Sequence, residues 1–239
     1  MSLRARLLLI ACVLVVAAVC AGLGIWQVNR LEQRRSANAT ALAARSAPPL
    51  VLDGGSPASV TMTNRRVEAT GHYDRGHDIV LRGRQYRGVP GVEIVSPLLL
   101  EGGRMAVLVN RGFVPSPDAV SIDADTLGET GEVTVQGIAL AVDSTGGAPL
   151  QRGRETSWAR LDRRALRTAL PYPIHPVYIR QSPDTTRRRF PRPLDPPPLD
   201  DGPHLSYAIQ WFSFAVLALV FGGVILRQER ERERQKRAR

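Results

Sequence analysis

The sequence predicts a membrane protein of the α+β class, in which two transmembrane helices at the chain ends flank a mainly antiparallel, barrel- or sandwich-like β domain with one or two helices. Three observations support this prediction. An uncharged apolar run lies near each end of the 239-residue chain, short apolar segments of β type fill the middle, and glycine, proline or aspartate bounds most of those segments. The composition excludes collagen and disulfide-stapled mini-domains, since the chain has only 2 cysteines and no Gly-X-Y repeat.

The first apolar run, residues 7–25, carries no charge over its nineteen residues. A helix rises about 1.5 Å per residue, so this run nearly crosses a hydrocarbon core of about 30 Å. It is therefore predicted to be a transmembrane helix that follows a short cytoplasmic N-terminus, residues 1–6. A cleavable signal peptide is the alternative, because Val19-Cys20-Ala21 resembles a cleavage site.

The second apolar run, residues 209–226, is eighteen residues long and also uncharged. The tail that follows it, residues 227–239, carries seven basic residues, whereas residues 193–207 contain no lysine or arginine. The positive-inside bias places such a tail in the cytoplasm, and two spans then place the N-terminus there too. We expect a multi-pass protein of the cell (plasma) membrane whose residues 26–208 form an extracytoplasmic domain.

Topology explains the basic charge of the chain better than nucleic-acid binding does. The formal net charge is +10, and a large part of the excess flanks the two spans. Such charges orient spans and favour anionic headgroups, so membrane lipids are expected partners and nucleic acid is not. Both cysteines, Cys12 and Cys20, lie in the first span, and the sequence has no G-x-S-x-G, H-E-x-x-H or P-loop motif. We therefore do not expect an enzyme.

The middle of the chain is predicted to be a β domain with few helices. Apolar residues on one face predict a helix over residues 158–170, and a polar helix over residues 30–45 continues the first span. Residues 187–203 contain six prolines, so they are predicted to form an extended linker back to the membrane. The candidate strands are residues 66–70, 79–84, 92–96, 105–109, 133–140 and 177–180.

A candidate cofactor site lies where the two spans reach the outer membrane interface. Helical spacing places one histidine and several aromatic rings along one side of the second span, and it groups aromatic and arginine side chains at the end of the first. An imidazole for the iron, apolar walls and guanidinium groups for carboxylates are the contacts that haem uses. An interfacial aromatic belt with a solvated histidine is the alternative. The residues concerned are His204, Tyr207, Trp211, Trp26, Arg30 and Arg34.

Four blocks, in order along the chain, resemble one known family. They are GLGIWQVNRLEQR (residues 22–34), GVEIVSPLLLEGGRMAVLVNRGFVP (91–115), SWARLD (157–162) and PHLSYAIQWFSFA (203–215). Together they are similar to the Surfeit-locus family of cytochrome c oxidase assembly factors, to which the Shy proteins of yeast mitochondria belong. The likeness covers both spans and most of the middle domain.

The resemblance implies a membrane protein that helps to build haem-copper cytochrome c oxidase by holding haem a and passing it to the catalytic subunit. His204 takes the place of the family's proposed haem-iron ligand, and Trp26, Gln27 and Arg30 match its W-Q-x-x-R block. Oxidase subunits, the catalytic subunit above all, are the expected partners, and the resemblance leaves the haem a synthesis machinery open as another. The alternative is a cofactor-free membrane scaffold that stabilises oxidase subunits during assembly.

The N-R-G block of the family matches Asn110-Arg111-Gly112, which follows a predicted strand. Two interpretations stay open. In the first, Gly112 permits an unusual backbone angle in a turn, and Arg111 pairs with a carboxylate. In the second, the block is a docking edge for an oxidase subunit, so that Asn110, Arg111 and Gly112, with Gln27 on the first span, contact that partner.

Overall fold

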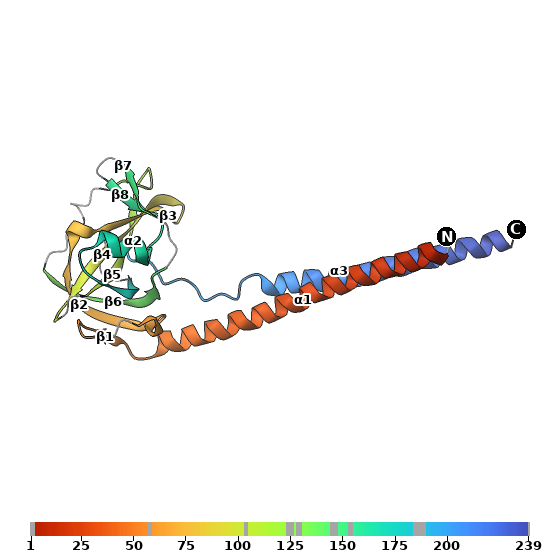
Figure 1. The fold of residues 1–239 in the computed structure, drawn as a ribbon, viewed down its shortest axis with the longest axis horizontal. Helices are drawn as coiled ribbons and strands as arrows, with labels where there is room; N and C mark the ends of the chain where they lie inside the picture. The colour runs from red at the N-terminus through yellow and green to blue at the C-terminus, as the bar shows by residue number, and fades with distance from the viewer. Residues whose placement is uncertain are drawn as a thin grey trace. The chain divides into compact units, whose positions relative to one another are not determined.

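The computed structural model describes residues 3–56, 59–102, 105–122, 127, 131–143, 148–152, 155–183 and 190–238. The chain divides into two compact units, of which one joins the chain ends, Met1–Thr40 and Leu199–Arg239, and the other spans Ala41–Pro198. Figure 1 shows a pair of long helices, α1 (Leu3–Ser46) and α3 (His204–Arg237), and a domain made mostly of strands. The predicted fold class is confirmed, because two apolar helices at the chain ends flank a β domain in the sequence.

Both predicted spans are helical. α1 covers the first apolar run and continues to Ser46, which confirms the polar helix expected after that run. α3 begins at His204, shortly before the second run, and continues through most of the charged tail. Both helices are long and apolar enough to cross a membrane. Only 17% and 11% of their most apolar windows are buried, whereas the core helix of a soluble protein would be mostly buried.

The two helices pack against each other through small side chains. A Cβ atom added at Gly24 would lie 2.7 Å from the ring of Phe212, and one added at Gly222 would lie 2.7 Å from Val13. The earlier residue of α1, Val13, meets the later residue of α3, Gly222, and the later residue of α1, Gly24, meets the earlier Phe212, so the helices are antiparallel. The buried and half-buried positions recur in steps of three and four, as in a coiled-coil seam. They include Val13, Ala17, Cys20, Gly24, Gln27 and Leu31 on α1, and His204, Ala208, Trp211, Ala215, Ala218 and Gly222 on α3.

Five strands of the β domain close into a small barrel in the order β2–β6–β9–β5–β4, and β4 returns to β2 through the register Gly71↔Leu100 to Tyr73↔Leu98. Every pair in this ring is antiparallel except β5 with β9. Closure leaves these strands without the long unpaired edges of an open sheet. The barrel strands are β2 (Arg66–Tyr73), β4 (Val89–Leu100), β5 (Ala106–Pro115), β6 (Glu132–Ala141) and β9 (Ile174–Gln181).

Four further strands extend the barrel. β3 (Ile79–Tyr86) pairs with β4, and β8 (Glu155–Trp158) and β7 (Leu150–Arg152) follow it outward. β1 (Leu50–Leu52) adds to β2 in parallel. The six predicted strands are confirmed, and β1, β7 and β8 are additional.

Apolar side chains fill the barrel and the space between the outer strands and the short helix α2 (Arg163–Ala169). Val67, Leu98 and Ile179 belong to the cluster inside the barrel, and Leu108 and Trp158 belong to a second cluster. Each fully buried side chain of this kind contributes about 1.5–3 kcal/mol. Since both cysteines lie in α1, this burial stabilises the β domain without a disulfide.

The helix predicted over residues 158–170 is shorter than expected, and the first two residues of the apolar face predicted for it, Trp158, Leu161, Ala165 and Ala169, lie outside the helix. α2 spans Arg163–Ala169 because the side chain of Asp162 caps it by accepting two backbone N–H groups of the first turn. Trp158 ends β8 instead, and the buried residue within the helix is Leu166.

The proline-rich linker has the extended character predicted for it. Residues 190–203 form no helix, while residues 187–189 lie outside the described residues. Two backbone hydrogen bonds fasten the linker to β5: Phe113 N donates to Arg192 O, and Arg192 N donates to Phe113 O, both at 2.8 Å. The linker is therefore held on the β domain over part of its length.

Candidate functional site

His204 and Gln27 meet across the helix pair. The Nδ1 atom of His204, the first residue of α3, lies 2.9 Å from Oε1 of Gln27, whose side chain is in the seam of α1. An amide oxygen only accepts, so Nδ1 is the donor in this contact and Nε2 carries the free lone pair. A neutral imidazole in this tautomer can coordinate a metal through Nε2.

Aromatic rings line one flank of the helix pair beside this contact. A rotation of about 100° per residue places Trp26 and Arg30 on one flank of α1, and it places Tyr207 and Phe214 on the flank of α3 that faces the same side in an antiparallel pair. Trp26 is 56% exposed and Tyr207 is 48% exposed, so both rings present open faces. Trp211 is half-buried and meets Phe214 edge to face, with ring centroids 5.8 Å apart.

The two arginines expected to pair with propionates make other contacts. Arg30 donates from Nη1 to Gln33 Oε1 on its own helix at 3.1 Å. Arg34 donates from Nε to the carbonyl oxygen of Asp200 at 3.2 Å, just before α3 begins. Each of these bonds uses a single N–H of a guanidinium group that has five, so further donors exist on both side chains.

The turn that leads into α3 is tied to α1. Arg35 Nε lies 2.9 Å from Asp201 Oδ2, and this hydrogen-bonded pair holds the pKa of Asp201 below its usual range. Asn38 Nδ2 also donates to the carbonyl oxygen of Asp200 at 2.8 Å. These bonds fix the point at which His204 starts its helix.

The surroundings of His204 suit a histidine that ligates haem iron. Histidine ligands commonly donate the second ring N–H to an oxygen acceptor, which fixes the tautomer and the ring orientation, and Gln27 supplies that acceptor. Exposed aromatic faces supply an apolar wall. Among the described residues there is no group of three or more His, Cys, Asp or Glu side chains that could hold a metal ion by themselves.

The N-R-G block forms a β-bulge inside β5, so the predicted turn is wrong. The register against β4 shifts between Ile94↔Gly112 and Val95↔Asn110, which leaves Arg111 as the extra residue. Gly112 has the unusual backbone angle that was predicted, with φ of +118°. Asn110 and Arg111 are each only 3% exposed, which places their side chains inside the domain.

Arg111 reaches a carboxylate through an intermediate hydroxyl. Its Nη2 donates to Leu127 O at 3.0 Å, and its guanidinium group lies 4.8 Å from the centre of the Tyr73 ring. Ser96 lies 3.5 Å from Nη1 and donates in turn to Asp78. Burial raises the pKa of Asp78, while Ser96 and the charge of Arg111 oppose that rise.

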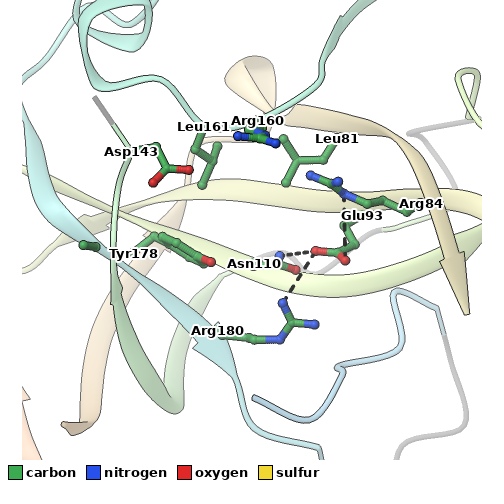
Figure 2. A pocket seen from close by; sticks show the side chains of 10 residues that line it. Leu81, Arg84, Glu93, Asn110, Asp143, Arg160, Leu161, Tyr178 and Arg180 are labelled. Carbon is green, nitrogen blue, oxygen red and sulfur yellow. Dashed lines mark hydrogen bonds and ion pairs between the residues drawn. The ribbon is translucent and has the colours of Figure 1, made fainter. Parts of the chain in front are cut away.

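A second candidate site is a polar cavity of about 390 Å³ in the β domain (Figure 2). Its central residue is Glu93, whose Oε2 accepts a hydrogen bond from Asn110 Nδ2 at 2.5 Å. Arg84 Nε and Arg180 Nη1 lie 4.0 and 3.9 Å from the same carboxylate. The lining residues are Leu81, Arg84, Glu93, Asn110, Ala141, Asp143, Arg160, Leu161, Tyr178 and Arg180.

Sequence reasoning missed the role of Gln27 and the whole polar cavity. The expected contact of Gln27 with a partner protein stays a prediction; within the chain, Gln27 is 9% exposed and its side chain is bonded to His204. The steps of three and four between small residues on α1 place position 27 in the helix seam, so a signal for it exists. The cavity has no such signal, since its residues come from strands and connecting segments that are distant in the sequence.

Comparison with known proteins points to one family. A family model described as the SURF1 family matches residues 14–216. A SURF1-like protein of Monosiga brevicollis is 28% identical over 218 residues, which cover 85% of this chain and 82% of the relative. A SURF1-like protein of Rickettsia felis is 24% identical over 214 residues, which cover 87% and 92%. An uncharacterized SURF1-like protein of Mycobacterium bovis is 28% identical over 179 residues, which cover 72% and 64%.

Proposed function

Because this chain belongs to the SURF1 family, a family of assembly factors linked to cytochrome oxidase, we propose that it binds haem a on the flank of the α1–α3 pair that carries Trp26 and Tyr207, and that it aids insertion of haem a into the catalytic subunit of haem-copper cytochrome c oxidase. The single observation that carries the haem proposal is the hydrogen bond between His204 Nδ1 and Gln27 Oε1. It joins both apolar helices and leaves Nε2 as the coordinating atom.

In this proposal Nε2 of His204 would ligate the haem iron. Gln27 orients the imidazole and holds its proton on Nδ1, which keeps the lone pair on the opposite nitrogen. Trp26, Tyr207 and Trp211 provide an apolar wall against the porphyrin face. Arg30, and Arg34 with its remaining N–H groups, are the partners for the propionates.

The described residues around His204 favour transient rather than permanent binding of haem. Trp26 and Tyr207 are half-exposed, so residues that hold haem here would stay accessible to the protein that receives it, as release of the cargo requires. A single histidine with one orienting bond is also a weak holder compared with two axial protein ligands. Oxidase subunits are therefore the proposed partners, because they would take over the released group.

The test is the absorption spectrum of full-length protein purified from cells that make haem a. We expect a Soret band in the wild type that His204→Ala loses and that His72→Ala, an exposed histidine of β2, retains. Gln27→Leu should keep the histidine but weaken haem retention about tenfold or more, in line with other orienting partners of ligands. An unchanged spectrum in His204→Ala would reject the ligand assignment.

The cofactor-free scaffold gives a different result in the same experiment. Oxidase subunits would then copurify with the wild type and with His204→Ala alike, and neither preparation would contain haem. Measuring haem and copurified subunits on the same samples separates the two functions.

A further inference from the structure

The polar cavity around Glu93 holds more hydrogen-bond donors than its own acceptors can use. Three guanidinium groups, of Arg84, Arg160 and Arg180, face two carboxylates, of Glu93 and Asp143. Figure 2 shows Glu93 between Arg84 on one side and Asn110 and Arg180 on the other. The cavity therefore has a positive balance in a partly enclosed space.

Glu93 does not saturate these arginines. Distances of 4.0 Å to Arg84 Nε and 3.9 Å to Arg180 Nη1 allow charge attraction but exceed hydrogen-bond length. The short bond of Glu93 goes to Asn110 instead. Arg84 Nε is buried, and no described residue accepts its hydrogen. An unmatched buried donor of this kind is costly, so it favours a ligand that brings an acceptor.

The arginines are fixed in place before any ligand arrives. Arg84 donates from Nη2 to Ala159 O at 3.0 Å, and Arg180 donates from Nε to Asp195 O in the linker at 3.0 Å. These bonds leave other N–H groups of each guanidinium for the cavity. Preorganised donors reduce the entropy lost when a ligand binds.

The other walls define the kind of ligand. Tyr178 lines the cavity, and burial raises the pKa of its phenol, so the hydroxyl keeps its proton and can donate. Leu81 and Leu161, 4% and 6% exposed, form an apolar side. A compact organic anion with a short hydrocarbon stem matches both features better than an inorganic ion does.

We propose that this cavity binds an organic carboxylate, either a small free acid or an acidic side chain of a partner protein. The carboxylate would accept hydrogen bonds from the guanidinium groups of Arg84 and Arg160 and from the hydroxyl of Tyr178. Its stem would lie against the two leucines. The site belongs to the β domain alone and is separate from the helix pair that is proposed to hold haem.

The test is calorimetric titration of the full-length chain in lipid nanodiscs with glutarate, with inorganic phosphate, and with a glutamate-containing peptide against its glutamine counterpart. We expect glutarate, the glutamate peptide or both to bind, and the glutamine peptide not to bind. Binding of glutarate alone identifies a small free acid as the ligand, and binding of the glutamate peptide alone identifies a partner's side chain. Tightest binding of phosphate, equal binding of both peptides, or no binding by any probe would overturn the proposal.

Three variants sharpen this test. Arg160→Gln at the rim should weaken binding about tenfold or more, the effect of one charged hydrogen bond. Arg164→Gln, which changes an exposed arginine outside the cavity, should leave binding unchanged. Glu93→Gln keeps an acceptor for Asn110 but removes a repelling charge, so it should strengthen binding about threefold or more. Weaker binding of glutarate by Glu93→Gln would show that the Glu93 carboxylate does not repel the ligand and would contradict the proposal.

Discussion

Gly112 has two structural roles: it adopts a backbone conformation that the β-bulge needs, and it leaves room for the linker to pass close to β5. Its φ of +118° is a conformation that side chains rarely adopt, and a Cβ atom there would lie 2.0 Å from the carbonyl oxygen of Arg192. The N–H of Gly112 also donates to Asn110 Oδ1 at 3.0 Å, which orients the amide toward Glu93. Gly112 thus permits the bulge, allows the linker to pack against β5, and orients Asn110 in the cavity.

Gly112→Ala should therefore destabilise the β domain by at least about 2 kcal/mol, since both backbone strain and a backbone clash oppose it. Thermal unfolding followed by near-ultraviolet circular dichroism measures this effect. Gly55→Ala is the matched control, because among the described residues its added Cβ would meet only Asp53 Oδ1, at an ordinary 3.6 Å. Equal melting temperatures for the two variants would contradict this account.

The carboxylate of Asp118 makes the stability of its turn depend on pH. Its carboxylate accepts hydrogen bonds from Ser121 N at 2.9 Å, Ser116 Oγ at 2.7 Å and Val120 N at 3.0 Å, and these bonds hold its pKa far below the usual range. The lowered pKa means that the bonds stabilise the fold above the unfolded pKa of about 3.9 and are lost as pH falls through the folded value.

We expect the carboxyl carbon of Asp118 to titrate by NMR well below pH 3.9, the ordinary midpoint. Ser116→Ala should move that midpoint upward, because one acceptor bond to the ionised form is removed. A midpoint at the ordinary value in the wild type would show that the turn does not hold the carboxylate.

Among the elements, the helix pair depends on where its glycines lie. Gly24 and Gly22 are two residues apart on α1, yet only Gly24 contacts α3, where Phe212 covers it. Gly24 is in the same seam as Gln27, one turn away. Close approach at this point is therefore a condition for the hydrogen bond between Gln27 and His204.

Gly24→Leu should separate the helices and weaken haem retention. Gly22→Leu should leave both unchanged, since no described residue lies within 4 Å of a Cβ atom at that position. Electron–electron distance measurements between spin labels at exposed Leu14 and Val220, in a chain whose native cysteines are replaced by alanine, report the separation. An identical distance distribution in both variants would refute the role of Gly24.

The elements also show which patterns in the sequence are informative. The barrel strands β4 and β5 were predictable because each contains an apolar run of β type, although almost every position of β5 is buried and its side chains do not alternate. β1 has only three residues, which is too short for such a signal. The helix over residues 158–170 was predicted too long for a different reason: its apolar residues, spaced by three and four, belong partly to β8 and partly to α2. Asp162, a capping residue, marks the true start of α2.

For the whole molecule, the predicted topology remains to be tested. The basic tail after residue 226 should lie in the cytoplasm and the β domain outside it, because positive charge resists translocation. A green fluorescent protein fused after residue 239 should fluoresce, and alkaline phosphatase inserted after the exposed Gly88 should be active. The reverse pattern would overturn the orientation.

The two candidate sites differ in how far sequence predicts them. His204 and Gln27 each belong to a recognisable block, but their contact joins residues 177 positions apart. It was missed because helix pairing depends on the faces of both helices together. The Glu93 cavity lies further beyond sequence reasoning, since closure of the barrel and the packing of the outer strands create it, and no local spacing encodes either.

The attachment of the linker has a mechanical consequence. A pull applied at residue 198 would load the bond from Arg180 to Asp195 first and then the pair between Arg192 and Phe113, one after the other. Bonds loaded in succession peel at lower force than the ladders of a closed barrel, whose rungs share the load. Under tension the linker would therefore detach from the β domain and extend while the barrel stays folded.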